Sequence, residues 1–151
     1  CERAALSPGR SLLMYLLDTN VVSELRKART GKADVRVAAW AEATSASAMF
    51  LSAISVLELE LGILLVERRD AAQAALLRAW LDKHVLPAFD GRILPVDTGV
   101  ARCCARLHVP DPRAERDALI AATALVHGLT VVTRNVGDFE ATNVGLLNPW
   151  T

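Results

Sequence analysis

Short apolar runs alternate along this chain with longer amphipathic segments, and no other feature of the sequence restricts the fold as strongly. The apolar runs have the length of β-strands, and they are MYLLD (14–18), MFLSAI (49–54), RILPV (92–96), TVVT (130–133) and GLLN (145–148). Helical patterns fill the segments between them. Strands that alternate with helices build a mostly parallel sheet with crossover helices. We therefore expect an α/β fold with a central sheet of four to five strands.

Local signals predict the ends of three helices. Ser55 and Glu58 have the spacing of a capping box at the start of the helix that follows MFLSAI. Two prolines in HVPDPRAERD (108–117) are expected to end one helix before the next begins. Gly128 is expected to terminate the helix that precedes TVVT.

The length of 151 residues suits one domain, which we assign to residues 14–151. Residues 1–13 begin without Met, contain Pro and Gly, and lack the hydrophobic core of a signal peptide. We expect an N-terminal extension there, made of upstream residues or of residues added for expression.

The charge balance limits how this chain can bind nucleic acid. Lys and Arg number 17 together, and so do Asp and Glu, so the whole molecule has no general attraction for a polyanion. Any such binding must be local. Hydrophobic residues make up 52% of the chain, and the mean hydropathy is +0.29. Both values indicate apolar surface that a partner or a second copy covers, and we expect an oligomer.

Nothing in the sequence indicates a membrane protein. The longest apolar stretches, LGILLV (61–66) and ALIAATALV (118–126), fall well short of the roughly 20 residues that a membrane span needs. The three cysteines show no CxxC motif and no regular spacing. We expect a cytoplasmic protein.

Four acidic residues are predicted to meet at one edge of the sheet. Asp18 ends the first strand, Glu58 lies about one helical turn after the second, and Asp138 follows TVVT. Asp117 lies early in the helix ERDALIAATALVHG (115–128). Ligands of open parallel sheets bind outside the carboxyl ends of the strands. We therefore treat these four acids as candidate catalytic residues.

Each acid also has an ordinary structural interpretation. Asp18 has the position of an N-cap residue, and Glu58 has that of the capping-box partner of Ser55. Asp117 is an acid near a helix N-terminus, where the helix dipole favours it. Asp138 has the position of a loop acid. The sequence leaves these alternatives open for each residue taken singly.

Four carboxylates at one edge destabilise a fold unless a cation binds them, because like charges raise each other's pKa. No Cys or His lies near these acids with the spacing of metal ligands. Ligation by oxygen alone favours Mg²⁺ or Mn²⁺ over zinc. We expect Asp18, Glu58 and Asp117 to hold such an ion, with Asp138 completing the site.

A site of this kind suits phosphoryl chemistry, because Mg²⁺ in proteins is typically held by carboxylates together with substrate phosphate. Thr133 and Asn135 follow a strand and are expected to support the acids, as are Thr19 and Asn20 next to Asp18. The histidines lie in predicted helices away from the acid edge, which argues against a metal-free ribonuclease.

Candidate contacts to a phosphate backbone are Arg26 and Lys27, in the basic run RKARTGK (26–32), and Arg134. The alternative for the run is a solvated loop. Neither interpretation is favoured by the sequence.

Metal-assisted hydrolysis needs no sugar 2′-OH, so the residues alone do not distinguish RNA from DNA as the substrate.

Three segments together resemble the PIN-domain nucleases, specifically VapC-type toxins of bacterial toxin–antitoxin pairs and their FitB-like branch. The segments are LLDTNVVSEL (16–25), SVLELELGI (55–63) and RDALIAATALVHGLTVVTRNVGDFE (116–140). In this comparison the first family acid corresponds to Asp18, the glutamate of the ExxxG pattern to Glu58, and the aspartate before IAATA to Asp117. The variable fourth acid corresponds to Asp138, and the TRN signature to Thr133 and Asn135.

The resemblance implies a three-layer α/β/α fold and an endoribonuclease that depends on Mg²⁺ or Mn²⁺. It also implies a homodimer, and a VapB-like antitoxin whose tail crosses the acidic crevice. Two other functions stay open. One is a non-catalytic module that binds RNA or protein, and the other is a phosphatase similar to the haloacid dehalogenases. The second is disfavoured because Asn20 stands where that family has the second aspartate of its DxD motif.

Overall fold

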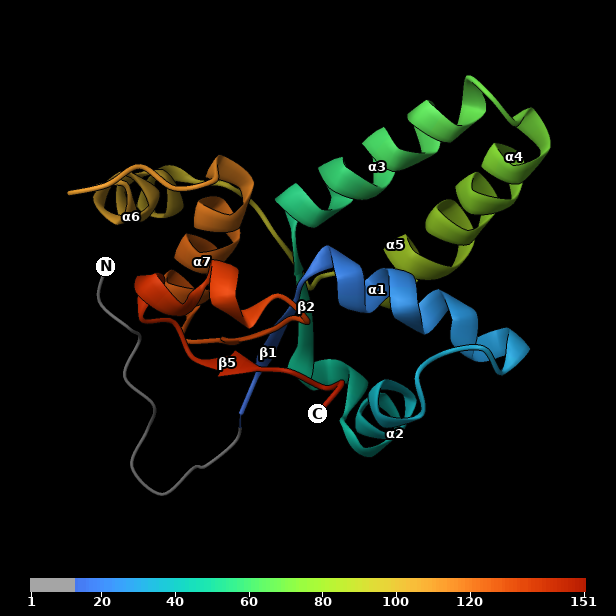
Figure 1. Cartoon of the computed structure of the whole chain (residues 1–151), viewed down its shortest axis with the longest axis horizontal. Helices are drawn as coiled ribbons and strands as arrows, with labels where there is room; N and C mark the ends of the chain where they lie inside the picture. The colour runs from blue at the N-terminus through green and yellow to red at the C-terminus, as the bar shows by residue number, and fades with distance from the viewer. Residues whose placement is uncertain (1–12) are drawn as a thin grey trace.

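The computed structural model describes residues 13–151, which form one five-stranded parallel sheet covered by helices (Figure 1). The strands are Tyr15–Leu17 (β1), Met49–Ser52 (β2), Ile93–Leu94 (β3), Thr130–Val132 (β4) and Leu146–Leu147 (β5). Their order in the sheet is β3-β2-β1-β4-β5, and every neighbouring pair is parallel. The predicted α/β class is confirmed, with all five expected strands present.

Helices occupy the predicted segments between the strands. They are Thr19–Arg26 (α1), Val35–Ala43 (α2), Ala53–Glu67 (α3), Ala71–Trp80 (α4), Leu86–Ala88 (α5), Thr98–Leu107 (α6) and Glu115–His127 (α7). A π-helical turn, Leu81–Val85 (η3), joins α4 to α5. Short 3₁₀ segments are Lys27–Thr30 (η1), Ala46–Ala48 (η2), Val136–Asp138 (η4) and Glu140–Thr142 (η5).

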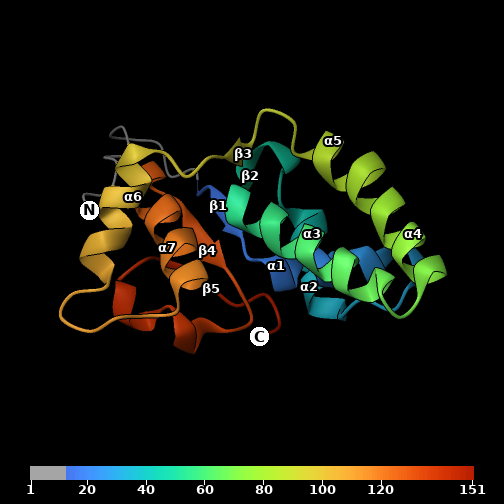
Figure 2. The same ribbon diagram turned by 90° about the horizontal axis from the view of Figure 1, so that it is seen from above.

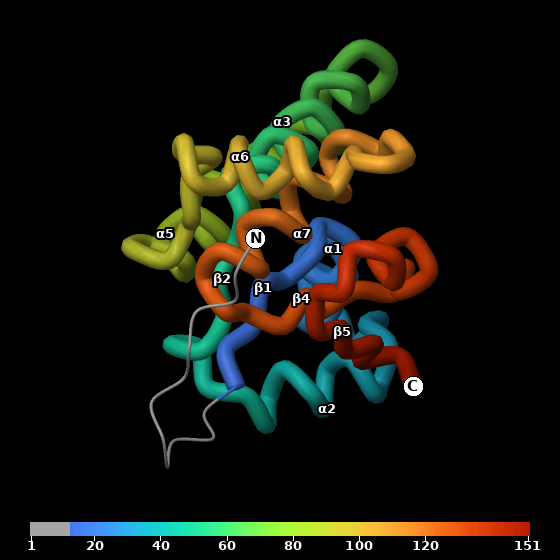
Figure 3. The backbone as a smooth tube through the Cα atoms, turned by 90° about the vertical axis from the view of Figure 1, so that its left-hand side faces the viewer, coloured from blue at the N-terminus to red at the C-terminus, as the bar shows by residue number. Residues whose placement is uncertain are grey.

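The two faces of the sheet pack against different helices because successive strand residues point to opposite sides. Leu16 and Val131 lie in a buried cluster with residues of α6 and α7. Leu17 and Val132, one residue further along their strands, lie in a second cluster with residues of α1, α3 and α4. Figures 2 and 3 show the sheet between these two layers.

The helix ends correct one prediction and confirm another. Ser52 is the N-cap of α3, and its hydroxyl accepts a 2.9 Å hydrogen bond from the Ile54 N–H. The predicted capping box of Ser55 and Glu58 is therefore wrong, because β2 ends two residues earlier than expected and Ser55 lies inside the helix. Gly128 ends α7 with φ of 68°, as predicted.

Two further expectations concern the ends of the molecule and membranes. Apart from residue 13, the predicted N-terminal extension lies outside the described residues. Within residues 13–151, no helix combines the length and the hydropathy that crossing a membrane requires.

Candidate active site at the carboxyl edge of the sheet

Asp18 joins the ends of two neighbouring strands. It follows β1 directly, and its Oδ1 accepts a 2.8 Å hydrogen bond from the Thr19 N–H, so the residue caps α1. Its Oδ2 accepts a 2.8 Å bond from the hydroxyl of Thr133, the residue after β4. The Asn20 side chain donates to the same oxygen at 3.4 Å. The capping and the functional interpretations of Asp18 are therefore compatible, since each uses a different oxygen.

Burial and neighbouring charges act on the Asp18 carboxyl, which is only 7% exposed. Burial is the main cause that raises its pKa above the ordinary value of an aspartate. The hydrogen bonds from Thr133 and Thr19 act in the opposite direction, while the charges of Glu58 and Asp138 raise the pKa further. The carboxylate is thus held in place by donors but is disfavoured by its surroundings.

Glu58 reaches the same region from the second turn of α3. Its Oε1 accepts a 2.8 Å hydrogen bond from the Thr19 hydroxyl, which links α3 to the start of α1. Its Oε2 lies 3.7 Å from the Arg116 guanidinium, on the first turn of α7. Residues next to two other acids, Asp18 and Asp117, therefore fix the position of the Glu58 carboxylate.

Asp117, on the first turn of α7, shows most clearly that the acids meet. Burial and the charges of Asp18, Asp138 and Glu58 raise its pKa from 3.8 to about 6. Asp138, at the end of η4, is exposed to solvent and belongs to this group through its charge. The structure thus brings all four predicted acids from four separate segments into one another's electrostatic field.

The four side chains offer carboxylate oxygens, which are the ligand type that a hard divalent cation prefers. Carboxylates whose charges raise the pKa of Asp18 and Asp117 are stabilised together by a bound Mg²⁺ or Mn²⁺ ion. In their present rotamers, however, no three Asp, Glu, His or Cys side chains of residues 13–151 are arranged to ligate one ion. Glu58 is bound instead to Thr19 and Arg116. Ligation by three of the acids therefore requires side-chain rotation.

The predicted supporting residues form a network beneath the acids. The Thr133 hydroxyl, besides binding Asp18, accepts a 3.0 Å hydrogen bond from the Asn135 N–H. The Asn20 side chain contacts Thr133 Oγ1 at 3.4 Å, and its Oδ1 accepts a 3.3 Å bond from the Arg134 N–H. Through these bonds the segment after β4 is held against the segment after β1.

The basic candidates Arg26 and Lys27 are partly engaged elsewhere. The Arg26 guanidinium lies 5.9 Å from the ring centroid of Trp80. The Lys27 ammonium pairs with Glu24 at 3.5 Å. Nothing in these contacts tests a role in RNA binding, which stays a prediction for both residues.

The histidines make contacts away from the four acids. His84 contacts the Arg29 guanidinium, and His108 Nδ1 accepts a 3.0 Å bond from the Arg113 N–H. His127 is exposed at the end of α7.

One residue next to the acids, Arg116, was missed by the sequence analysis. Its position directly before Asp117 at a helix start was the available signal.

A cavity of about 240 Å³ opens beside Glu58, between α1, α3 and α4. Thr19 and Gly62 line it near the acid, and Arg26 and Trp80 line its other end. Arg26 and Trp80 also line a second cavity of about 130 Å³ next to α5. The two mainly apolar cavities adjoin at Arg26 and Trp80, and we refer to them together as the channel along α1.

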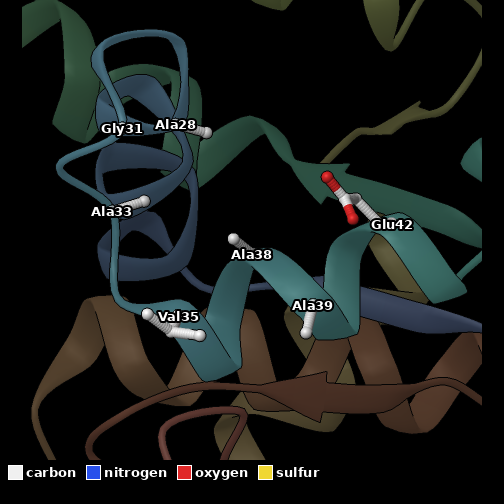
Figure 4. A pocket seen from close by; sticks show the side chains of 7 residues that line it. All are labelled: Ala28, Gly31, Ala33, Val35, Ala38, Ala39 and Glu42. Carbon is white, nitrogen blue, oxygen red and sulfur yellow. The ribbon is translucent and has the colours of Figure 1, made fainter.

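A third cavity, of about 310 Å³, lies between η1 and α2 (Figure 4). Small side chains such as Ala28, Ala38 and Ala39 line it, and Glu42 is its single acid. None of the four clustered acids belongs to it, so we do not assign the activity to this cavity.

Comparisons with known proteins agree with this geometry. The model of the PIN domain matches residues 15–144. The toxin FitB of Neisseria gonorrhoeae is 41% identical over 143 residues, covering 91% of this chain and 99% of FitB. The VapC ribonuclease Y4jK of Sinorhizobium fredii is 38% identical over 142 residues, covering 91% and 98% of the two chains. The crystal structure of FitAcB from N. gonorrhoeae superposes with a TM-score of 0.82 at 40% identity, covering 91% and 99%.

Proposed function

This chain belongs to the PIN-domain family, and we propose that it is a VapC-type endoribonuclease, the toxin of a toxin–antitoxin pair, with a Mg²⁺ or Mn²⁺ requirement. Relatives named as a toxin and as a ribonuclease match it along nearly their whole length. The observation that carries the catalytic part of the proposal is the charge cluster around Asp117. Asp18 also caps α1, but capping does not account for the three acidic charges, of Asp18, Asp138 and Glu58, that raise the pKa of Asp117.

We propose that Asp18, Glu58 and Asp117 hold the ion and that Asp138 completes the site. When bound there, Mg²⁺ or Mn²⁺ supplies Lewis acidity toward an attacking water and toward phosphate oxygens. Thr133 orients the Asp18 carboxylate and favours its ionised form against the effect of burial, because it donates to the oxygen that does not cap α1. Thr19 orients the Glu58 carboxylate through its hydroxyl.

A cleavage assay on the purified chain without antitoxin tests this proposal. We expect cleavage of single-stranded RNA with Mg²⁺ or Mn²⁺, none in excess chelator, and none by Asp18→Asn. The matched control is Asp90→Asn, since Asp90 is exposed and lies outside the four-acid cluster. Cleavage that persists in chelator or in Asp18→Asn would rule out the metal mechanism. An active control together with an inactive Asp18→Asn supports it.

The non-catalytic alternative predicts a different result. If the wild-type chain binds RNA but leaves it uncut under every metal tested, the acids have no catalytic role. The phosphatase alternative is abandoned, because the PIN model covers residues 15–144 and Asn20 is not an acid.

We further propose that a VapB-like antitoxin occupies the channel along α1 and places a basic side chain against the acids. The channel supports this because it is mainly apolar and begins at Glu58. Exposed leucines on the neighbouring α3–α4 pair add apolar surface for a partner or a second copy, and they are Leu57, Leu61, Leu64, Leu65 and Leu76. Co-expression with the product of the adjacent gene should yield a stable complex without ribonuclease activity.

A further inference from the structure

An arginine and a tryptophan, from the segments that follow β4 and β5, contact each other. The Arg134 guanidinium lies 5.3 Å from the ring centroid of Trp150. A second arginine, Arg36 at the start of α2, donates a 3.2 Å hydrogen bond to the Trp150 carbonyl. Figures 1 and 3 show the C-terminus beside α2, as this bond requires.

The register of the sheet shows that the segments of both residues start at the edge that carries Asp18. Val132 of β4 pairs with Leu147 of β5 in a parallel ladder, so the residues after both strands leave the sheet at its carboxyl edge. Asp18 leaves β1 at the same edge, since Leu17 pairs with Val132. The segment that contains Arg134 therefore starts one strand away from Asp18 at this edge, and the segment that contains Trp150 starts two strands away.

Hydrogen bonds connect Arg134 to the acids more directly. Its N–H donates to the Asn20 side chain, whose amide group in turn donates to Asp18. Yet the Arg134 guanidinium is exposed and pairs with no carboxylate of residues 13–151. Arg116, by contrast, is already paired with Glu58. The Arg134 backbone is thus fixed next to Asn20, and its guanidinium lies over Trp150 without a carboxylate partner among residues 13–151.

An RNA strand needs such a charge here. The molecule has no net charge that attracts a polyanion, and the four carboxylates repel phosphate. A guanidinium held over an aromatic ring keeps its N–H groups available for a phosphate, and its outer plane can stack with a base. The tryptophan ring limits the number of positions that the arginine samples, which lowers the entropy cost of binding.

We propose that Arg134, held in place by Trp150, is a substrate-positioning residue that binds a backbone phosphate of the RNA strand adjacent to the cleaved bond. This inference rests on the ribonuclease activity proposed above. It assigns to the C-terminal Trp150 a role in holding the substrate contact, and it gives Arg36 the task of fixing the Trp150 backbone.

Binding and kinetics on the full chain test the inference together. Fluorescence anisotropy with a labelled single-stranded RNA in chelator measures affinity without cleavage. We expect Arg134→Gln to bind about tenfold more weakly and to reduce the slope of log K against log salt by about 0.7, the value for one lost phosphate contact on a single strand. With Mn²⁺ present, KM should rise about tenfold while kcat stays within about twofold.

Matched variants separate this role from a general loss of charge or fold. Arg69→Gln removes an exposed arginine after the end of α3 and should leave affinity and salt slope unchanged. Arg134→Lys retains the charge but loses the planar stack, so an intermediate affinity is expected. Trp150→Phe keeps an apolar ring with a weaker attraction for cations and should weaken binding about threefold, with an unchanged Tm.

Each other outcome has a definite meaning. If the wild-type chain binds and cleaves RNA and Arg134→Gln matches it in affinity, KM and salt slope, the inference is wrong and the proposed function stands. A variant that binds RNA normally but loses affinity for the antitoxin also overturns it, because the pair would then be a protein contact. If the wild-type chain neither binds nor cleaves RNA, the proposed function itself fails.

Discussion

The hydroxyl of Thr133 donates a 2.8 Å hydrogen bond to Oδ2 of Asp18 across 115 residues of sequence, and both groups are buried. The bond joins the carboxyl ends of β1 and β4, and it opposes the effect of burial on the Asp18 carboxyl. Removing this donor without changing the shape of the side chain isolates what it contributes.

Thr133→Val should destabilise the fold by about 2 kcal/mol, because a buried carboxylate loses a charge-assisted donor. The pKa of Asp18 should rise further, so the acid limb of the activity profile should move to higher pH. Denaturant unfolding and a pH series of kcat/KM measure the two effects. Thr130→Val is the control, since Thr130 begins β4, the strand that Thr133 follows, and the hydrogen bonds of residues 13–151 include none from its side chain. An equal loss of unfolding free energy in Thr133→Val and Thr130→Val would contradict the role of the Thr133 hydroxyl as a donor to Asp18.

Asp117→Asn should stabilise the protein at neutral pH in chelator while it abolishes cleavage. The folded chain holds this proton more tightly than the unfolded chain does, with a pKa of about 6 against 3.8. Stability is therefore lost as pH rises from about 4 to 6, and the loss persists above pH 6. Asparagine removes this penalty, which is about 1 kcal/mol after allowance for solvent screening of a half-buried group.

Thermal unfolding in chelator at pH 4 and pH 7.5 measures this effect. The Tm values of Asp117→Asn and of the wild type should differ little at pH 4 and clearly at pH 7.5. Asp90→Asn should show no gain at either pH. A variant less stable than the wild type at pH 7.5 would show that Asp117 serves the fold rather than a ligand.

Substitutions of Gly62 should separate stability from partner binding. A Cβ at this position meets no atom within 4 Å, and the residue lines the cavity beside Glu58. Gly62→Ala should therefore stabilise α3 by about 0.5 to 1 kcal/mol. Gly62→Leu should fold as well but fill the channel, which weakens antitoxin binding at least tenfold in a pull-down titration. Unchanged affinity in Gly62→Leu would place the antitoxin elsewhere.

Two serines of α3 should respond in opposite ways to replacement by alanine. Ser52→Ala removes the helix cap and should cost about 1 kcal/mol in unfolding free energy. Ser55→Ala removes a buried hydroxyl that has no hydrogen-bond partner in the described chain, and it should be neutral or stabilising. Denaturant titration of both variants checks the pair. A larger loss in Ser55→Ala would restore a capping role for that residue.

Sequence patterns alone determined the architecture and the identity of the four acids. Strand-length apolar runs such as MYLLD and TVVT, separated by amphipathic helices, have few alternatives to a parallel sheet. Parallel strands in turn place Asp18, Asp138 and Glu58 at one edge. The exact ends were less predictable, because Ser52 and Ser55 are both acceptable caps and only the length of β2 distinguishes them.

Tertiary structure alone decided which groups touch these acids. Strand order, which no local pattern encodes, puts β4 next to β1 and so brings Thr133 to Asp18. The same packing places Arg116 on Glu58 and Trp150 beneath Arg134, two contacts between segments distant in sequence. Hydrophobic periodicity determines which face of an element is buried, but a contact between two polar side chains depends on the distance between their backbones. Only folding sets that distance to a single value.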